Sequence, residues 1–493
     1  MFLRPMEQSF ETVNPFSASE RLPEKQDLPQ DMEDLTDPAV HRERLFSQDK
    51  RILDAVSALA TKVKSCPPDP KYPDNDPALL IVGGFARDSL IGKHPKDADV
   101  EVYGVPAARL EEFLDQLYGN KVNKVGRAFG IFKVALGDGL DLDISIPRRE
   151  SKVGAGHKGF EIHGDPAMSI KEAARRRDFT FNALAVDPLT GKYEDYFGGI
   201  EDLISKTLRV TDEERFQDDP LRVYRAIQFA ARMDLRAEEK SFALMQEMVD
   251  RGDLDELSNE RITEEWRKLL LKSERPSIGL RLSKELGIIE RYYPELNLTD
   301  SWDSLAQRVD HVAETIHNDE HVFTENEQLQ AMLGAICSMI DRKENEAVQN
   351  FLKKTSFSKK DVVNPINALL SERSEPLRIW KALEANELSE KQLANEVRKV
   401  IKRIYPASLE TLLALSGSGD DRPALLLREQ LSQNPGWLDP KKNQLINGAD
   451  LKSLGIPPGP EMGKTLALVE EARDRGEIST HEEAITWLSV RNG

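Results

Sequence analysis

The sequence predicts an α+β protein in which a mixed head of about 130 residues precedes a long helical remainder. From Ala78 to about Tyr196, short β-like runs alternate with helical segments and glycine turns. After about Leu203 the strand signals fade, and from Asp218 to Trp487 nearly every periodic stretch has helical spacing. Prolines interrupt this second part repeatedly, which predicts many separate helices.

Within the head, the periodicity predicts a helix that begins near Asp49 and carries apolar residues at helical spacing. The expected strands are the apolar or alternating runs Leu79–Val82, Ala98–Tyr103, Ile131–Leu136 and Leu140–Ile146. The 493 residues suggest roughly three or four domains. We predict a mobile acidic extension over 1–48, the head over 49–205, a helical neck over 206–290, a helical body over 291–425 and a helical tail over 426–493.

Composition excludes several classes of protein. No apolar run approaches the roughly 18 residues of a membrane helix, so we expect no membrane span. Two distant cysteines, Cys66 and Cys337, predict no disulfides and a reducing, cytoplasmic setting. The N-terminal stretch has no apolar core of secretory length and is too acidic for a transit peptide. The formal net charge of −18 disfavours a general nucleic-acid binder, because phosphates attract Lys and Arg.

A glycine turn is the first motif with possible chemistry. The strand that ends at Val82 runs into Gly83 and Gly84, and a helical stretch then ends near Gly92. Two glycines let a ligand approach the backbone closely, and a following helix offers free N–H groups to a phosphate. An ordinary tight turn is the alternative interpretation of this motif alone.

Two carboxylates follow the turn. Asp97 and Asp99 are alternate residues of a predicted strand and therefore project from one face. Paired carboxylates suit Mg²⁺ that is shared with substrate phosphates. The strictly alternating run from Leu140 to Ile146 supplies a third acid, for which Asp143 is our prediction and Asp141 the alternative.

Three ordered motifs together resemble the class II tRNA nucleotidyltransferases and bacterial poly(A) polymerases. They are Gly83-Gly84-x-x-Arg87-Asp88-x-x-x-Gly92-x-x-x-x-Asp97-x-Asp99, then Arg176-Arg177-Asp178-Phe179-Thr180-Phe181-Asn182-Ala183-Leu184, then Asp218-Asp219-Pro220-Leu221-Arg222-Val223-Tyr224-Arg225. The resemblance is close over about residues 78–235 and looser toward the C-terminus. It implies a nucleotidyltransferase head of the polymerase-β type.

The resemblance implies that a tRNA 3′-hydroxyl attacks the α-phosphorus of CTP or ATP and releases pyrophosphate. Asp97 and Asp99 would hold two Mg²⁺ ions, with Asp143 as the third catalytic carboxylate. The nucleotide phosphates would lie along Gly83, Gly84 and Arg87. The sugar would lie near Arg177, Asp178 and Asn182, because an Asn amide can donate to and accept from a 2′-hydroxyl.

The third motif would read the base. Asp219 and Arg222 are three residues apart, which on a helix gives them a common face. A carboxylate accepts from the amino group that C and A share, and an Arg donates to ring nitrogen or carbonyl oxygen. Arg225 would brace Asp219 or touch phosphate. Two positions depart from the family pattern: Asp218 replaces a usual Glu, and Gln228 replaces a usual Arg.

Two further segments carry expectations. Residues 148–178 hold eight Lys or Arg and five Asp or Glu, and their glycine-rich first half resembles the family's flexible loop, which helps the switch from CTP to ATP. Residues 301–342 resemble an eroded HD phosphohydrolase domain. Ser304 lies at the position of its first His, and Ser338 and Met339 replace its His-Asp pair. Since Met binds hard divalent ions poorly, we predict no hydrolase activity there.

The favoured interpretation is a cytoplasmic CCA-adding tRNA nucleotidyltransferase that acts on the tRNA 3′ end with CTP and ATP. A poly(A) polymerase or a partial enzyme that adds only CC or only A is the alternative in the same chemistry. An inactive RNA-binding scaffold is the alternative of another class. A monomer is expected, with a dimer as the alternative, and the tail is expected to contact tRNA.

Overall fold

The computed structural model describes residues 34–492 apart from 72, 74, 125–129, 153–159, 299–300, 341–345, 418–421 and 440–442. It confirms the α+β class with a mixed head and a helical remainder. The chain forms two compact units. The first, called the head below, comprises Met1–Arg222 and Leu235–Met245, and the second comprises Val223–Asp234 and Gln246–Gly493. The chain passes between the units within helices α9 (Leu221–Met233) and α10 (Glu239–Arg251), and once more between Asp234 and Leu235.

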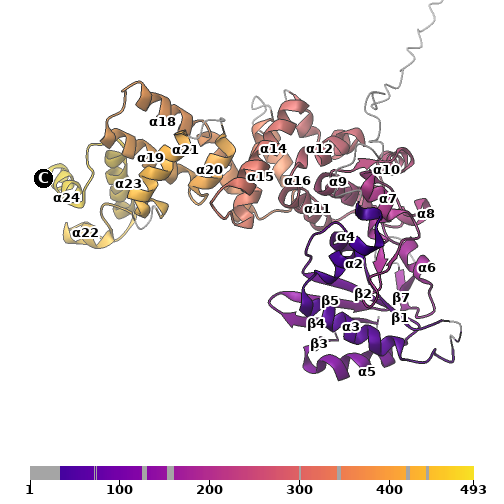
Figure 1. Ribbon diagram of the computed structural model, residues 1–493. Helices are drawn as coiled ribbons and strands as arrows, with labels where there is room; N and C mark the ends of the chain where they lie inside the picture. Colours follow the sequence, from indigo (N-terminus) through magenta and orange to yellow (C-terminus); the bar gives the residue numbers. More distant parts are fainter. Residues whose placement is uncertain are drawn as a thin grey trace, which may run out of the picture. The chain divides into compact units, whose positions relative to one another are not determined.

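A seven-stranded sheet forms the centre of the head (Figure 1). Its order is β3-β4-β5-β2-β1-β8-β9, and only β2 and β5 run parallel to each other. The strands are β1 (Ala78–Val82), β2 (Asp97–Tyr103), β3 (Val122–Asn123), β4 (Ile131–Gly137), β5 (Leu140–Ser145), β8 (Ala185–Val186) and β9 (Tyr193–Glu194). Strands β1, β2, β4 and β5 confirm the four predicted strands. The prediction succeeded because each of these segments has a strongly apolar or alternating pattern.

Alternation along β2 and β5 separates a buried face from a polar one. Ala98, Val100 and Val102 of β2 are at most 1% exposed, as are Leu142 and Ile144 of β5. Helices α3 (Lys50–Lys64) and α4 (Gly84–Leu90) pack against the sheet, and α5 (Ala107–Tyr118) packs on α3. The acidic residues of β2 and β5 consequently share the opposite, polar face.

The N-terminal boundary of the head differs from the sequence prediction. Residues assigned to the acidic extension form η2 (Asp34–Thr36) and α2 (Pro38–Phe46), so the ordered head includes residue 34 and does not begin at 49. Asp37 caps α2, and Arg44 Nη1 donates to Leu90 O of α4 at 2.7 Å. The helix is short and buries few apolar side chains, so its periodicity was too weak to detect. Residues 1–33 of the predicted extension lie outside the described residues.

The remaining elements of the head are short. Strands β6 (Arg148–Lys152) and β7 (Phe160–Gly164) pair antiparallel at the two ends of the glycine-rich segment, whose central residues 153–159 lie outside the described part. Strands β10 (Thr207–Leu208) and β11 (Arg236–Ala237) form a parallel pair. The other elements are η3 (Gly119–Lys121), α6 (Ile170–Arg175), η5 (Thr180–Asn182), α7 (Gly199–Ile204) and α8 (Glu213–Phe216).

The described residues of the second unit form helices without strands. The helices up to residue 354 are η6 (Asp253–Glu256), α11 (Asn259–Lys272), α12 (Pro276–Glu285), α13 (Ile288–Tyr292), η7 (Pro294–Leu298), α14 (Trp302–Asn318), α15 (Glu325–Ser338) and α16 (Ala347–Lys354). The later ones are η8 (Lys359–Val363), α17 (Asn364–Glu372), α18 (Glu375–Glu384), α19 (Glu390–Ile404), α20 (Leu409–Ser416), α21 (Arg422–Gln433), η9 (Pro435–Leu438), α22 (Gly448–Ser453), α23 (Pro460–Asp474) and α24 (His481–Asn492).

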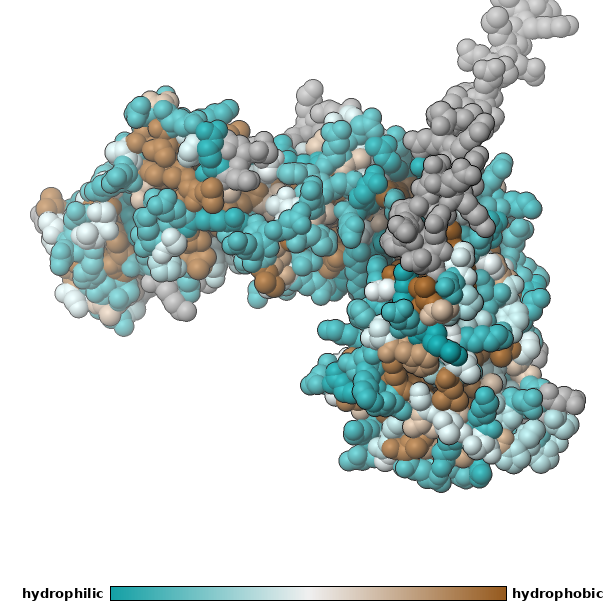
Figure 2. Space-filling model, viewed as in Figure 1, coloured by the Kyte–Doolittle hydropathy of each residue, from teal (hydrophilic) through white to brown (hydrophobic). Residues whose placement is uncertain are grey.

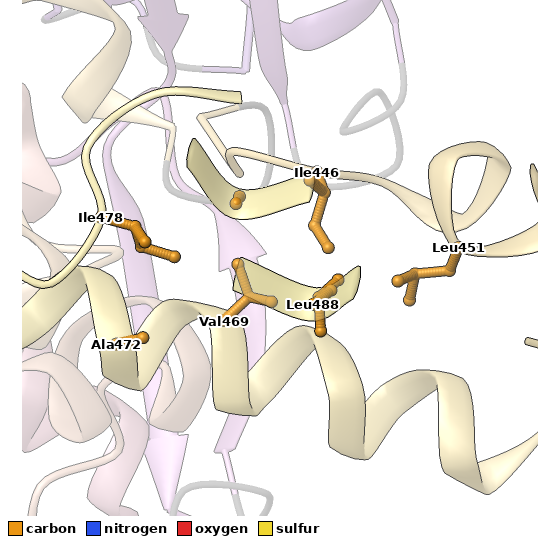
Figure 3. Close-up of a cluster of buried hydrophobic side chains, with 7 residues drawn as sticks. Ile446, Leu451, Val469, Ala472, Ile478 and Leu488 are labelled. Carbon is orange, nitrogen blue, oxygen red and sulfur yellow. The ribbon is translucent and has the colours of Figure 1, made fainter. Parts of the chain in front are cut away.

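The C-terminal helices have a hydrophobic cluster of their own. Figure 3 shows its side chains converging between α22, α23 and α24. The cluster comprises Ile446, Leu451, Val469, Ala472, Ile478, Ala484 and Leu488. This local core is compatible with the predicted tail over 426–493, while the predicted boundaries at 205, 290 and 425 stay predictions.

The eroded HD-like segment is helical where it is described. Ser304 lies in α14, Ser338 ends α15 with its Oγ donating to Ala335 O at 2.7 Å, and Met339 follows as the C-cap. Asp341 and Arg342 lie outside the described residues, and the HD-like assignment remains a prediction.

The expectations about disulfides and membrane spans can be compared with the structure directly. Cys66 and Cys337 are both free thiols, which confirms that they form no disulfide. No helix in the described part is long and apolar enough to cross a membrane. The face of the molecule in Figure 2 is largely hydrophilic with scattered hydrophobic patches.

Candidate active site

The glycine turn lies where β1 meets α4. Gly83 has φ +66 and ψ −128, a combination that residues with a Cβ rarely adopt. A Cβ built on Gly83 would lie 2.7 Å from Arg177 Nη1 and 3.7 Å from Asp99 Oδ2. Glycine is therefore needed here both for the backbone conformation and for the close approach of two charged side chains.

The acidic face lies beside this turn. Strands β2 and β5 are paired so that Asp97 lies opposite Asp141, and Asp99 lies opposite Asp143. Residues in register on parallel strands project to the same side, so all four carboxylates share one face. Lys133 of β4 forms ion pairs with both acids of β5, with Nζ 3.0 Å from Asp141 Oδ2 and 3.7 Å from Asp143 Oδ1.

Asp99 and Asp143 also line one cavity of about 350 Å³. Its charged lining consists of Asp99, Glu101, Asp143, Arg148, Arg176 and Arg177. Neither Asp97 nor Asp141 is part of this lining, and the choice of Asp143 as the third acid stays a prediction. Arginines and carboxylates facing a common space suit a ligand that carries both phosphate and divalent cations.

The electrostatics of Asp99 fit a position for a cation. Loss of contact with water raises the pKa of Asp99, the Arg177 charge opposes that rise, and the neighbouring Asp143, Glu101 and Asp97 raise the pKa further. Among the described residues, no three His, Cys, Asp or Glu side chains are close enough to hold a metal ion by themselves. Mg²⁺ is commonly held by one or two carboxylates plus substrate phosphates and water, so the residues present fit that ion when a nucleotide completes the site.

The second motif forms a buried chain of hydrogen bonds. Asp178 Oδ1 accepts from Asn182 Nδ2 at 2.9 Å, and Asn182 Oδ1 accepts from Arg87 Nη1. Arg87 Nε donates to Asp88 Oδ1 at 2.7 Å. Arg87, Asp178 and Asn182 are only 4–6% exposed. Arg87 therefore orients Asn182, and its expected place along the nucleotide phosphates stays a prediction.

The third motif connects to the second through Arg222. Its Nη2 donates to Arg176 O at 2.8 Å, and its Nη1 donates to Arg215 O at 2.5 Å. The expectation that Asp219 and Arg222 share a helix face is wrong, because α9 begins only at Leu221. Pro220 favours an extended residue before it, and Asp219 instead caps the helix, accepting from Leu221 N at 3.2 Å.

The other predicted residues of the motifs lie as follows. Gly84 is the first residue of α4, and a Cβ there would meet only Arg87 Nη2, at 3.9 Å. Asp218 is 3.7 Å from Arg215 Nη1. Arg225 belongs to the second unit, where its guanidinium lies 5.4 Å from the centre of the Phe229 ring.

Two residues of this site were not anticipated. Glu101 Oε1 accepts from Arg177 Nη2 at 2.8 Å, and its Oε2 accepts from the Tyr103 hydroxyl at 2.6 Å. Alternation along β2 was a sufficient signal for Glu101, because it continues the face of Asp97 and Asp99.

Comparison with known proteins finds two families that match parts of this chain. Residues 79–209 match the family described as the poly A polymerase head domain. Residues 234–299 match the family described as the probable RNA and SrmB-binding site of polymerase A.

Curated relatives share the first half of the chain. A multifunctional CCA protein of Stenotrophomonas maltophilia is 37% identical over 221 residues, which cover 44% of this chain and 52% of that protein. The multifunctional CCA protein of Chromobacterium violaceum is 36% identical over 244 residues, covering 50% and 56% respectively. The chain therefore spans about half the length of the curated relatives it matches.

Solved structures share the fold over most of the chain. A CCA-adding enzyme in complex with ATP has a TM-score of 0.62 at 23% identity, covering 92% of this chain and 98% of that one. The Bacillus stearothermophilus CCA-adding enzyme in complex with CTP has a TM-score of 0.60 at 21% identity, covering 90% and 97%. At this level of identity the similarity shows the fold.

Proposed function

We propose that this protein is a CCA-adding tRNA nucleotidyltransferase that uses CTP and ATP to complete the tRNA 3′ end. The observation that carries the proposal is the cavity of a poly A polymerase head domain in which Asp99 and Asp143 face three arginines. The names of the curated relatives and of the structural neighbours favour CCA addition within this chemistry. A cytoplasmic location is the matching expectation.

In the proposed reaction, the tRNA 3′-hydroxyl attacks the α-phosphorus and pyrophosphate leaves. Asp97 and Asp99 would hold two Mg²⁺ ions, with Asp143 as the third acid. Bound Mg²⁺ would lower the pKa of the attacking hydroxyl and neutralise phosphate charge. Arg148, Arg176 and Arg177 line the same cavity and would bind the triphosphate through charge-assisted hydrogen bonds.

The sugar would be selected by Asn182. Its amide already accepts from Arg87 and donates to Asp178, which fixes the direction in which it presents its remaining N–H and lone pair. A 2′-hydroxyl can use both, whereas a deoxyribonucleotide leaves them unmatched in a buried position. Arg87 and Asp178 thus support ribonucleotide selection by holding Asn182.

Asp219 and Arg222 would select the base of the incoming nucleotide. Each Nη of Arg222 carries two N–H groups, and the hydrogen bonds to Arg176 O and Arg215 O account for one on each. The anchored guanidinium would present its other N–H groups to the base, while the Asp219 carboxylate would accept from the amino group of C or A.

The proposal is tested with tRNA transcripts that lack the last three, two or one nucleotides. Each is incubated with Mg²⁺ and with CTP, ATP or both, and the products are resolved by length. We expect C, C and A to be added in order to the matching transcript, and Asp97→Ala to abolish incorporation. Failure of the wild type to incorporate any nucleotide would refute the proposal and favour an inactive RNA-binding scaffold.

Poly(A) synthesis is the second candidate, because both matching family descriptions refer to polymerase A. The same assay distinguishes it: a polymerase would extend any RNA with ATP alone and would not stop after one residue. Addition of only CC or only A would identify a partial enzyme.

A further inference from the structure

Glu101 is a carboxylate on the acidic face that has a different environment from its neighbours. It lies two residues after Asp99 on β2, and its side chain is 16% exposed. Both of its oxygens are engaged, Oε1 by Arg177 Nη2 at 2.8 Å and Oε2 by the Tyr103 hydroxyl at 2.6 Å. A carboxylate held on both sides is a poor candidate for a third metal ligand.

The partner of Glu101 lies at the centre of the site. Arg177 Nη1 is 2.7 Å from the point that a Cβ of Gly83 would occupy, and Asp99 Oδ2 is 3.7 Å from the same point. The guanidinium therefore crosses the glycine turn directly beside Asp99. Arg177 also lines the cavity that Asp99 and Asp143 share.

Arg177 reaches this place from a separate part of the chain. It follows α6, which ends at Arg175, and its side chain is 28% exposed. A long, partly exposed Arg side chain has several rotamers, so a fixed hydrogen-bond partner is needed to keep one of them. The ion pair with Glu101 provides such a partner for the Arg177 guanidinium.

We propose that Glu101 is a positioning residue that holds the Arg177 guanidinium across the Gly83 turn for the nucleotide triphosphate, with Tyr103 fixing Glu101 in turn. This inference rests on the proposed function, because it takes a nucleoside triphosphate as the ligand of the cavity. Since Glu101 acts through Arg177, its removal affects nucleotide binding only while Arg177 is present.

The direction in which Glu101→Gln changes nucleotide affinity distinguishes a positioning role of Glu101 from a general effect of its negative charge. Removal of a negative charge from the cavity by itself favours a polyanionic ligand. Positioning requires the opposite result: Glu101→Gln keeps the shape but weakens the hold on Arg177, so CTP and ATP bind less tightly. We expect a loss of about tenfold for Glu101→Gln and about threefold for Tyr103→Phe.

The experiment is isothermal titration calorimetry of the full chain with Mg²⁺ and CTP or ATP, without RNA. Glu111→Gln is the matched control, because Glu111 pairs with Lys124 in the head at 3.0 Å and is 12% exposed, yet does not line the cavity. The control is expected to bind like wild type. In an Arg177→Ala background, Glu101→Gln is expected to change the affinity less than twofold or to tighten it.

Each other outcome overturns a distinct claim. Unchanged or tighter binding by Glu101→Gln, or equal losses with and without Arg177, would overturn the positioning role. A wild-type chain that binds neither CTP nor ATP would overturn the proposed function and this inference with it. Circular dichroism melting of each variant verifies that the comparison is made between folded proteins.

Discussion

Substitution of Gly83 by alanine tests whether the Arg177 guanidinium needs a glycine at this turn in order to approach the backbone closely. Gly83 has φ +66 and ψ −128, and Gly119, elsewhere in the head, has nearly the same backbone conformation at φ 57 and ψ −123. A Cβ at Gly83 would lie 2.7 Å from Arg177 Nη1, whereas a Cβ at Gly119 would meet nothing within 4 Å. Gly119→Ala therefore carries the same backbone strain without the contact.

The two variants are expected to share one effect and to differ in another. Backbone strain lowers the free energy of unfolding by about 1–3 kcal/mol in each. At Gly83 the guanidinium must also move away from Glu101, which at its partial exposure costs about 1 kcal/mol more. Displacement of a phosphate-binding group should in addition lower kcat/KM for the nucleotide by about tenfold or more, in Gly83→Ala alone.

Urea denaturation gives the two free energies of unfolding, and nucleotide incorporation under conditions where both variants are folded gives kcat/KM. Equal kcat/KM for Gly83→Ala and Gly119→Ala would refute the link between the turn and Arg177. A much larger loss of stability in Gly119→Ala than in Gly83→Ala would refute the assumption that the two substitutions cause equal backbone strain.

Three further predictions concern other parts of the chain. Leu451→Ala, in the C-terminal cluster of Figure 3, should lower the free energy of unfolding by about 2–5 kcal/mol in a urea titration while CTP binding by the remaining folded protein is unchanged. Burial alone would raise the pKa of Asp474, but the hydrogen bond from Lys402 and the charge of Arg398 outweigh it and lower the pKa. Asp474→Asn should therefore be less stable than wild type above about pH 3.8, and the difference should disappear as pH falls through the lower pKa of the folded protein, as thermal melts across that range would reveal. KM for tRNA should rise about tenfold or more between about 50 and 200 mM salt, because an acidic chain must bind RNA through a confined basic surface; a flat salt profile would contradict this.

The sequence predicted the parts of the fold that rest on strong periodicity. The four main strands were anticipated because apolar runs and alternation set their buried faces, and the same alternation placed Asp97 and Asp99 on one side. Helix α2 was not located from the sequence, because it is short and its packing partner α4 is distant in sequence. Asp219 was placed on a helix because its spacing to Arg222 was considered without the effect of Pro220.

The sequence predicted which residues belong to the candidate site but not the contacts between them. The family resemblance implied roles for Arg87 and Asn182 separately, yet their hydrogen bond joins residues 95 positions apart, which no local pattern encodes. The ion pairs of Lys133 with Asp141 and Asp143 likewise depend on the register of β4 and β5. These contacts come from tertiary register, and the choice between Asp143 and Asp141 as the third acid stays a prediction.

The most direct test of the central claim compares wild type, Asp99→Asn and Asp141→Asn in a single assay for nucleotide addition to tRNA that lacks its CCA end. We expect ordered addition by wild type, loss of at least about a thousandfold in Asp99→Asn, and a much smaller change in Asp141→Asn, because the proposed reaction assigns Mg²⁺ to Asp99 and no role to Asp141. Undiminished addition by Asp99→Asn, or no addition by the wild type, would contradict it.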